Sequence, residues 1–579
     1  MINKSDSYKN SKVFLSGAII GAVIFLVIYG FDILNVTNDS LIFSGYIEKD
    51  IAQHYAGWML FRDSPWQFPL GVGQNIAYPY GSAVSYTDSI PLFAIFFKLF
   101  RNILPETFQY FGIFVLMCFM LQGAFGGLLS TLFTDKYIFN ILSSVLFAFT
   151  PVMIERAFRH CALTAHFLIL AALYYYFKNK GNFSFKAVIP FFIINALAIT
   201  IHPYFLPFTF GIMFAYCLEG FILDKQYLKS AGYLLLSIVS TLFIGYIIGA
   251  FYVKGPLGAG GYGLFSMNLN GLHNPISRGF DNWSAVLEIK PHETYQIEGF
   301  NYLGLGIILF IPVCCIIYIF TYKKDVFRIL FSFIKNYFGI IFSTACLFVF
   351  SIGDWVVFGG LRLFRLPIPD FLMNTICSVF RANGRFSWLL VYMIMLFVIF
   401  MISKLPVKWS EIAFCILLFI QIFDMRGVLS SKHAYFTGSE GDLQGQIFAS
   451  SLKHPFWNDV AENHEVGITF LEIPGVKNID FAVLFGKHHH AINANFEART
   501  DNILYTEELN KITESFENGT LDEKNALFFD TFSDELLNAV TKNGYSMYKA
   551  DGFYAVLTDL LSEEEINEYM NYPDFEVIA

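Results

Sequence analysis

Residues Ser44–Pro91 read SGYIEKDIAQHYAGWMLFRDSPWQFPLGVGQNIAYPYGSAVSYTDSIP. This stretch follows the first long apolar segment, Phe14–Leu34, and is too polar and too rich in turn-forming residues to lie within lipid. Its tryptophans and tyrosines, in contrast, are typical of the boundary between a membrane and water. The sequence therefore predicts a large loop, residues 34–107, at a membrane surface.

Within this loop, a carboxylate and an imidazole are spaced to share one face of a helix. If Asp50–Phe61 is helical, then Asp50, His54 and Trp58 lie one turn apart along the same side. Such a pair at a membrane surface is suited to acid–base chemistry. The alternative interpretation is a solvated loop whose carboxylates only keep it out of the bilayer.

The composition identifies the class of protein. Of the 579 residues, 55% are hydrophobic and 15% are charged, and the mean hydropathy is +0.52. Repeated apolar runs of about 20 residues predict a mainly α, polytopic helical membrane protein. We expect eleven spans, the first at Phe14–Leu34 and the others near 108–133, 137–152, 163–178, 187–202, 204–222, 230–252, 302–321, 336–352, 386–403 and 410–424. The short apolar run Leu92–Phe100 is expected to be re-entrant or interfacial.

Basic residues predict how these spans are oriented. Lysine precedes the first span, and every short loop on the same side carries Lys or Arg, the bias expected of cytoplasmic loops. An uncleaved signal anchor, a cytoplasmic N-terminus and an odd number of spans place the C-terminal segment outside. Arg156 and Arg159 are the exception, because they fall on the outer side, where snorkelling at a helix end is the alternative to a local function.

The last part of the chain differs from the rest. Residues 427–579 carry a net charge of −17, whereas residues 1–426 carry +8, and this distribution argues against a nucleic-acid-binding protein. We expect a soluble α/β domain there, with two helices, Thr506–Glu517 and Ser533–Lys542. Its expected strands include Ile468–Gly475, Phe481–Phe485, Leu527–Asp530 and Gly552–Leu557. The adjacent His488, His489 and His490 cannot all face one metal ion from a regular helix or strand, so a turn or the surface is expected for them.

Further polar residues gather at the predicted outer ends of the spans. Ionisable residues near lipid are candidates for function, although interfacial anchoring explains any single one of them. Their common side is the side of Asp50 and Asp88. The group that we assign to substrate binding consists of Arg159, His160, His202 and Tyr204.

Arg381 and Arg385 form the most specific pair in this group. Their spacing of four residues lets both guanidinium groups face one way, which suits a phosphate or pyrophosphate. A salt bridge to the acidic C-terminal domain is the alternative. We favour phosphate because a lipid head-group would lie at this level of the bilayer.

These features together resemble the membrane glycosyltransferases of the C-type (GT-C) fold, and more closely an uncharacterised bacterial branch of it. The resemblance covers roughly residues 10–425. The matching segments are Asp50–Trp58, Arg62–Trp66, Tyr86–Pro91, Glu298–Gly304 and Arg381–Arg385, and less clearly Ile492–Arg499.

The resemblance implies a mechanism. The outer-loop carboxylate of the family is a general base, which corresponds to Asp50, and His54 would hold or tune it. Some relatives have paired acidic residues there, whereas Lys49 and Ile51 flank Asp50 in this chain. A divalent metal is therefore in doubt, no cofactor is firmly expected, and a second carboxylate would be Asp88 or Glu298.

The resemblance also implies a biological role. Residues 1–426 would form the catalytic membrane domain, and residues 427–579 an extracytoplasmic acidic domain. The protein would transfer a sugar from a polyprenyl-phosphate donor to a glycan, lipid or protein acceptor of the cell envelope, at the outer face of a bacterial cytoplasmic membrane. A transporter or flippase of lipid-linked sugars is the alternative, but it would favour charges at the bilayer midplane and internal repeats, and the sequence has no evident repeat. The glycine-rich 258–263 is expected to be a flexible lid.

Overall fold

The structure is a computed structural model that describes residues 4–38, 42, 50–253, 261–277, 282–438, 451–471, 476–495 and 497–579. The chain forms two compact units. The helical unit contains residues 1–34, 111–244 and 257–441, and the sheet unit contains residues 35–110, 245–256 and 442–579. The polar loop thus groups with the C-terminal segment, whereas the sequence suggested a single division after residue 426. Lys49 and the first half of the predicted 258–263 lid, residues 258–260, lie outside the described residues.

The helical unit has apolar helices at all eleven predicted positions. They are α1 (Lys4–Tyr29), α4 (Phe111–Thr131), α5 (Tyr137–Ala148), α7 (Phe167–Lys178), α8 (Phe185–Ile201), α9 (Leu206–Ile222), α10 (Tyr227–Ile247), α11 (Leu305–Tyr322), α13 (Phe338–Ile352), α15 (Trp388–Ser403) and α16 (Val407–Thr437). Among the described residues, eight stretches are helical, long and apolar enough to cross a membrane, and α5, α8 and α13 are shorter apolar helices. The mainly helical, multi-span fold class is confirmed.

Other elements of this unit were not predicted. Between the long helices lie α6 (Pro151–Ile154), α12 (Val326–Asn336) and α14 (Asp370–Leu372). The segment after α13 forms an antiparallel hairpin of β3 (Trp355–Phe358) and β4 (Leu361–Arg365). α16 also extends about three turns beyond the predicted end of the last span.

Small residues let α1 and α4 pack closely. A Cβ atom added to Gly21 would lie 2.0 Å from the carbonyl oxygen of Phe119, and one added to Gly123 would lie 2.3 Å from the carbonyl oxygen of Gly17. Neither contact is possible for a larger residue without movement of a helix. Such close approach is the usual way in which helices associate inside a membrane, where apolar side chains gain nothing by leaving lipid.

Hydrogen bonds join the loops that the lysine pattern assigned to one side. Lys9 pairs with Asp135, and the Nζ atom of Lys136 donates to the carbonyl oxygen of Leu405 over 2.9 Å. Lys180 likewise donates to the carbonyl oxygen of Asn336. The first two contacts join one group of basic segments and the third joins another, so the members of each group lie at the same end of the helical unit, as predicted. Which side of the membrane that end faces stays a prediction.

The sheet unit is built around a six-stranded mixed sheet. Its strands are β5 (Val466–Phe470), β6 (Ala491–Ile492), β7 (Asn525–Phe529), β8 (Ser546–Ala550), β9 (Phe553–Leu557) and β10 (Phe575–Val577). Their order is β10-β8-β9-β7-β5-β6, with β5 parallel to β6 and β7 and the other pairs antiparallel. Its helices are α2 (Asp50–Asp63), α3 (Pro91–Lys98), α17 (Phe456–Asn463), α18 (Val476–Lys487), α19 (Asn502–Glu517), α20 (Asp534–Asn543) and α21 (Glu563–Tyr569), and a two-residue pair joins β1 (Val72–Gly73) to β2 (Ser82–Ala83).

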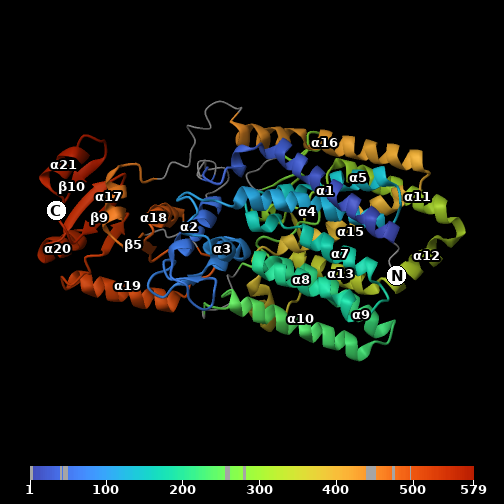
Figure 1. The fold of residues 1–579 in the computed structure, drawn as a ribbon, viewed down its shortest axis with the longest axis horizontal. Coiled ribbons are helices and arrows are strands. Elements are labelled where there is room, and N and C mark those ends of the chain that lie inside the picture. Colours follow the sequence, from blue (N-terminus) through green and yellow to red (C-terminus); the bar gives the residue numbers. More distant parts are fainter. Residues whose placement is uncertain are drawn as a thin grey trace. The chain divides into compact units, whose positions relative to one another are not determined.

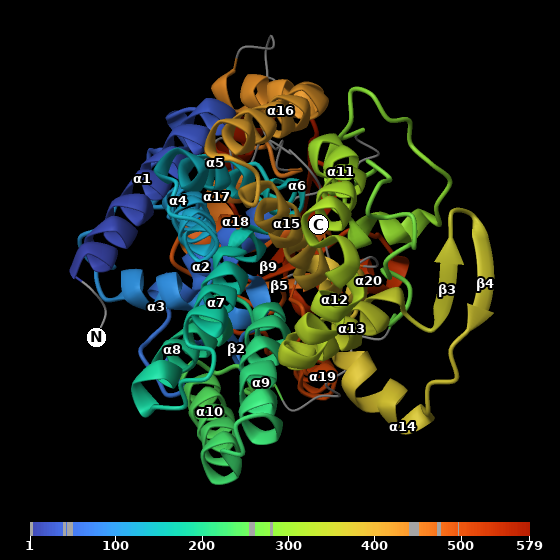
Figure 2. The ribbon, with the colours of Figure 1, turned by 90° about the vertical axis from the view of Figure 1, so that its right-hand side faces the viewer.

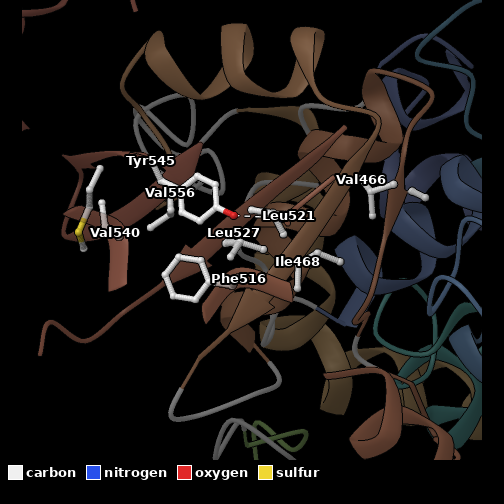
Figure 3. Close-up of a cluster of buried hydrophobic side chains, with 10 residues drawn as sticks. Val466, Ile468, Phe516, Leu521, Leu527, Val540, Tyr545 and Val556 are labelled. Atoms are coloured by element: carbon white, nitrogen blue, oxygen red, sulfur yellow. Dashed lines mark hydrogen bonds between the residues drawn. The ribbon is translucent and has the colours of Figure 1, made fainter. Parts of the chain in front are cut away.

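Apolar side chains hold helices against this sheet. Figure 3 shows Ile468, Leu527 and Val556 of the strands together with Phe516 of α19 and Val540 of α20, all buried. The predicted α/β character of the C-terminal segment is confirmed.

One predicted strand in this segment is wrong. Phe481–Phe485 lies within helix α18. A run of five apolar residues does not distinguish a strand from a buried helix, and here Phe481, Ala482 and Phe485 are all fully buried with helical spacing. The prediction for the three histidines is correct, because they follow α18 in a turn where Nδ1 of His489 lies 2.8 Å from Oδ2 of Asp63.

Candidate functional site

Helix α2 of the sheet unit carries the predicted acid–base residues. Asp50 is its first residue and His54 follows one turn later, so the expected helical face exists. Both side chains are buried, His54 completely. The Nε2 atom of His54 lies 3.9 Å from Oδ2 of Asp88, whose side chain is 24% exposed. The structure thus brings two predicted residues together, with a third on the same helical face.

A turn packed tightly on α2 places Asp88. The turn follows a short 3-10 helix, Val84–Thr87, and Asp88 has the left-handed backbone conformation, with φ of 55°. The Oγ atom of Ser89 donates to the backbone carbonyl of His54 over 2.6 Å. Gly57 makes this approach possible, because a Cβ atom there would lie 2.2 Å from Oγ1 of Thr87.

Trp58 anchors the same helix inside the protein. It is completely buried, and its indole Nε1 donates to the carbonyl oxygen of Phe108 over 2.9 Å. The expectation that this tryptophan lies at the boundary between membrane and water is therefore wrong. Its side chain instead fixes α2 against the segment that leads into α4.

In the helical unit, two arginines converge on one glutamate. Nη1 of Arg156 and Nη2 of Arg385 lie 3.0 and 3.1 Å from the same oxygen, Oε2 of Glu298. All three side chains are more than nine-tenths buried. Since two cations surround one carboxylate, the cluster keeps a net positive charge, which suits an anionic ligand.

Tyr204 lines this cluster. The guanidinium carbon of Arg385 lies 5.3 Å from the Tyr204 ring centroid, and the Tyr204 hydroxyl accepts from the backbone N–H of Ala382 over 3.0 Å. The preceding His202 uses Nδ1 to accept from the backbone N–H of Tyr204. His202 therefore shapes the turn between α8 and α9, whereas Tyr204 itself reaches the segment that carries Arg385.

Arg381 and Arg385 do not share a helical face. The helix here is a short 3-10 segment, Asn383–Ser387, which begins after Arg381. Arg385 is buried against Glu298, while Arg381 is exposed and its guanidinium carbon lies 4.7 Å from the Phe265 ring centroid. The predicted α-helical spacing is wrong because the backbone bends at Arg381 and the following residues, Asn383–Ser387, form a 3-10 helix in place of an α-helical turn.

Arg159 has a local partner. It pairs with Glu155 one turn earlier, and the second oxygen of Glu155 accepts from Nε1 of Trp283 over 3.1 Å. Both charged side chains are buried. The neighbouring His160 is partly buried in the same loop. Arg156 and Arg159, the two basic residues that did not fit the orientation bias, thus both pair with a carboxylate inside the protein.

The chain matches the model of one known family over residues 18–426, and that family is described as "Domain of unknown function (DUF6311)". This chain belongs to that family. No curated protein matches its sequence. Eight chains of solved structures match, and one of them is an Archaeoglobus fulgidus oligosaccharyltransferase tethered with an acceptor peptide containing the NVT sequon. That similarity has 10% sequence identity and a TM-score of 0.40, and covers 94% of this chain and 74% of the other.

All of the candidate residues lie in the part of the chain that matches DUF6311. This part includes Asp50, His54 and Asp88 of the sheet unit and Glu298 and Arg385 of the helical unit. The six-stranded sheet begins at Val466, after the match ends. A polar loop that groups structurally with the C-terminal segment therefore belongs, by sequence, to the family region.

Sequence reasoning missed several residues of these clusters. Glu155, Trp283 and the partnership of Arg156 with Glu298 were not predicted. An acidic residue directly before Arg156, in a segment between two apolar runs, is a signal that could have indicated an internal ion pair. The partner of Arg156, in contrast, is 142 residues away in the chain and is not indicated by local spacing.

Proposed function

We propose that this protein is a membrane glycosyltransferase of the GT-C type that transfers a sugar from a polyprenyl-phosphate donor to an extracytoplasmic acceptor. The observation that carries the proposal is the group on α2 and its neighbouring turn, where Asp50 and His54 share a helical face and Asp88 lies 3.9 Å from His54. Two carboxylates beside one imidazole supply a base and a residue that orients it. The resemblance of the Asp50–Trp58 segment to GT-C enzymes supports the same role.

The proposed reaction has two requirements. Asp50 takes the proton of the acceptor as the acceptor attacks the anomeric carbon, and the bond between that carbon and the phosphate oxygen breaks on the opposite side, with inversion. The departing lipid phosphate needs positive charge. Arg385 and Arg381 supply it, together with Arg156, for which the sequence suggested only an unspecified local function. Arg159, His160, His202 and Tyr204 are proposed to shape the substrate site.

The test of the base is a transfer assay with purified protein in vesicles and a radiolabelled polyprenyl-phosphate hexose. Asp50→Asn keeps the shape of the side chain but is a poor base, so we expect transfer to fall by about a hundred-fold to ten-thousand-fold while donor binding is retained. Asp88→Asn is the matched comparison on the same cluster. A fully active Asp50→Asn variant together with an inactive Asp88→Asn variant would reassign the base to Asp88.

The test of the phosphate site is donor binding. Arg385→Lys keeps the charge but loses the planar fork, so we expect affinity for polyprenyl phosphate to fall by about tenfold or more. Arg381→Lys, at an exposed position, is the comparison within the predicted pair. Unchanged binding in the Arg381→Ala/Arg385→Ala double variant would refute the assignment. Movement of the labelled lipid across the bilayer without any transfer would favour the alternative, a flippase.

A further inference from the structure

Helix α12 is a feature that the proposed reaction does not use. It reads VFRILFSFIKN (Val326–Asn336) and connects α11 to α13. None of its residues is buried, and two of its phenylalanines are largely exposed, Phe327 at 72% and Phe331 at 67%. A helix that exposes so much apolar surface needs an apolar environment outside the protein.

Basic residues border one apolar face of α12. Phe327, Leu330, Phe331 and Ile334 follow the spacing of a single helical face. Arg328 and Lys335, seven residues apart, lie together along one edge of this face, and Lys323 and Lys324 precede the helix. One acidic residue, Asp325, pairs with Arg328 over 3.2 Å, which leaves an excess of positive charge.

The position of α12 excludes a membrane span. α11 ends at Tyr322, and Lys323 has a left-handed backbone, with φ of 47°, so the helical direction breaks there. The 11 residues of α12 are about 16 Å long, roughly half of the thickness of a hydrocarbon core. Figure 2 looks along the long helices and shows α12 between α11 and α13.

The end of α12 lies among the basic loops. Lys180, in the loop between α7 and α8, donates to the carbonyl oxygen of Asn336, the last residue of α12. The hydroxyl of Tyr318 in α11 donates to the carbonyl oxygen of Val326, the first residue. α12 is therefore held at both ends where the long helices stop.

We propose that α12 lies in the plane of the bilayer surface and binds anionic lipid. Its apolar face enters the boundary of the acyl chains, while Arg328, Lys335 and the lysines before the helix contact lipid phosphates. The charge complementarity and the direct continuity with membrane helices identify the occupant as an anionic leaflet. This surface is independent of the proposed transfer reaction and lies at the basic end of the helical unit.

The test uses the full-length protein in vesicles of phosphatidylcholine with 30% phosphatidylglycerol. The photoreactive residue p-benzoyl-phenylalanine replaces Phe331, and the adducts formed on irradiation are identified by mass. We expect lipid adducts in which the ratio of phosphatidylglycerol to phosphatidylcholine is about fivefold higher than in the vesicle, which corresponds to about 1 kcal/mol for a basic residue at the surface. The same photoreactive residue at Phe419, exposed on the membrane helix α16, is the matched reporter and should show the bulk composition.

Charge removal completes the test. Arg328→Gln/Lys335→Gln should abolish the over-representation at position 331 but keep the lipid adducts, whereas Lys511→Gln/Lys524→Gln, at exposed ion pairs of the sheet unit, should change nothing. The proposal would be overturned if position 419 formed lipid adducts but position 331 formed none. It would also be overturned if the adducts at position 331 had the bulk lipid composition while Arg328 and Lys335 are unchanged. Adducts with another protein would show that α12 binds a protein partner and not lipid. A thermal unfolding curve for each variant excludes loss of fold as the cause.

Discussion

Arg156 holds Glu298 at two points. Nη1 donates to the carboxylate oxygen Oε2 over 3.0 Å, and Nη2 donates to the backbone carbonyl of the same residue over 2.9 Å. Arg385 adds a third bond, again to Oε2. A carboxylate that already accepts from two guanidinium groups is poorly placed to take a proton from a substrate. Of the carboxylates that we considered as the base, Glu298 is therefore the least suited to that role, and its contacts suit it to positioning the two arginines.

The first prediction concerns this buried cluster. Glu298→Gln removes the negative charge between two buried cations, so we expect the free energy of unfolding to fall by about 3–5 kcal/mol. Glu293→Gln is the control, because Glu293 pairs with Arg362 at an exposed position and its loss should cost about 0–1 kcal/mol. Denaturation in detergent measures both. Equal effects of the two substitutions would contradict the assigned role of Glu298.

The second prediction concerns the close approach at Gly57. A Cβ atom there would lie 2.2 Å from Oγ1 of Thr87, so Gly57→Ala must displace the turn that carries Asp88. We expect a loss of about 1–3 kcal/mol of stability and reduced sugar transfer. Gly232→Ala in α10 is the control, because no atom lies within 4 Å of its added Cβ and alanine favours a helix. Full transfer activity in Gly57→Ala would show that the position of Asp88 is irrelevant to the reaction.

The membrane helices could be predicted from the sequence because their signal is local. An apolar run of the right length is stable in lipid only as a helix, and basic residues in the short loops indicate which loops lie on the same side of the membrane. All eleven predicted spans correspond to helices. The prediction missed α12, because an amphipathic helix of 11 residues with four basic residues in it or directly before it resembles a charged loop in a hydropathy scan.

The candidate site could be predicted only in part, since its members meet through long-range contacts. Asp50 and His54 were paired correctly because helical spacing is a local property. The approach of Asp88 to His54 depends on Gly57 and on a left-handed turn, and neither feature can be recognised in the sequence as bringing these two residues together. For Arg385, the local interpretation failed because a distant carboxylate, on Glu298, determines where its side chain points.

The third prediction is a pH dependence in the sheet unit. Burial raises the pKa of Glu497 to about 8, although a hydrogen bond from Ser82 acts in the opposite direction. Between pH 4.5 and 8 the folded state then binds more protons than the unfolded state, so stability falls as pH rises through this window and levels off above pH 8. The free energy of unfolding changes by at most about 4–5 kcal/mol, which is the energetic equivalent of the pKa difference.

Thermal unfolding of the purified protein between pH 5 and pH 9 measures this dependence. Glu497→Gln removes the titrating group, so its unfolding temperature should vary less over this range than that of the unmodified protein. Glu576→Gln, which removes an exposed carboxylate paired with Lys549, should retain the original profile. An unchanged profile in Glu497→Gln would exclude Glu497 as the source.

The last prediction is the orientation in the membrane. Lys9, near the start of α1, and Lys136 and Lys180, in loops, each make a hydrogen bond to a neighbouring segment at an end of the long helices. Basic loops are retained in the cytoplasm, so the C-terminal segment should be outside. An epitope tag after Ala579 should be removed by protease added to spheroplasts, while a tag before Met1 should be protected until lysis. Protection of the C-terminal tag in intact spheroplasts would reverse the orientation, and it would place the proposed acid–base residues in the cytoplasm, where an extracytoplasmic transfer could not occur.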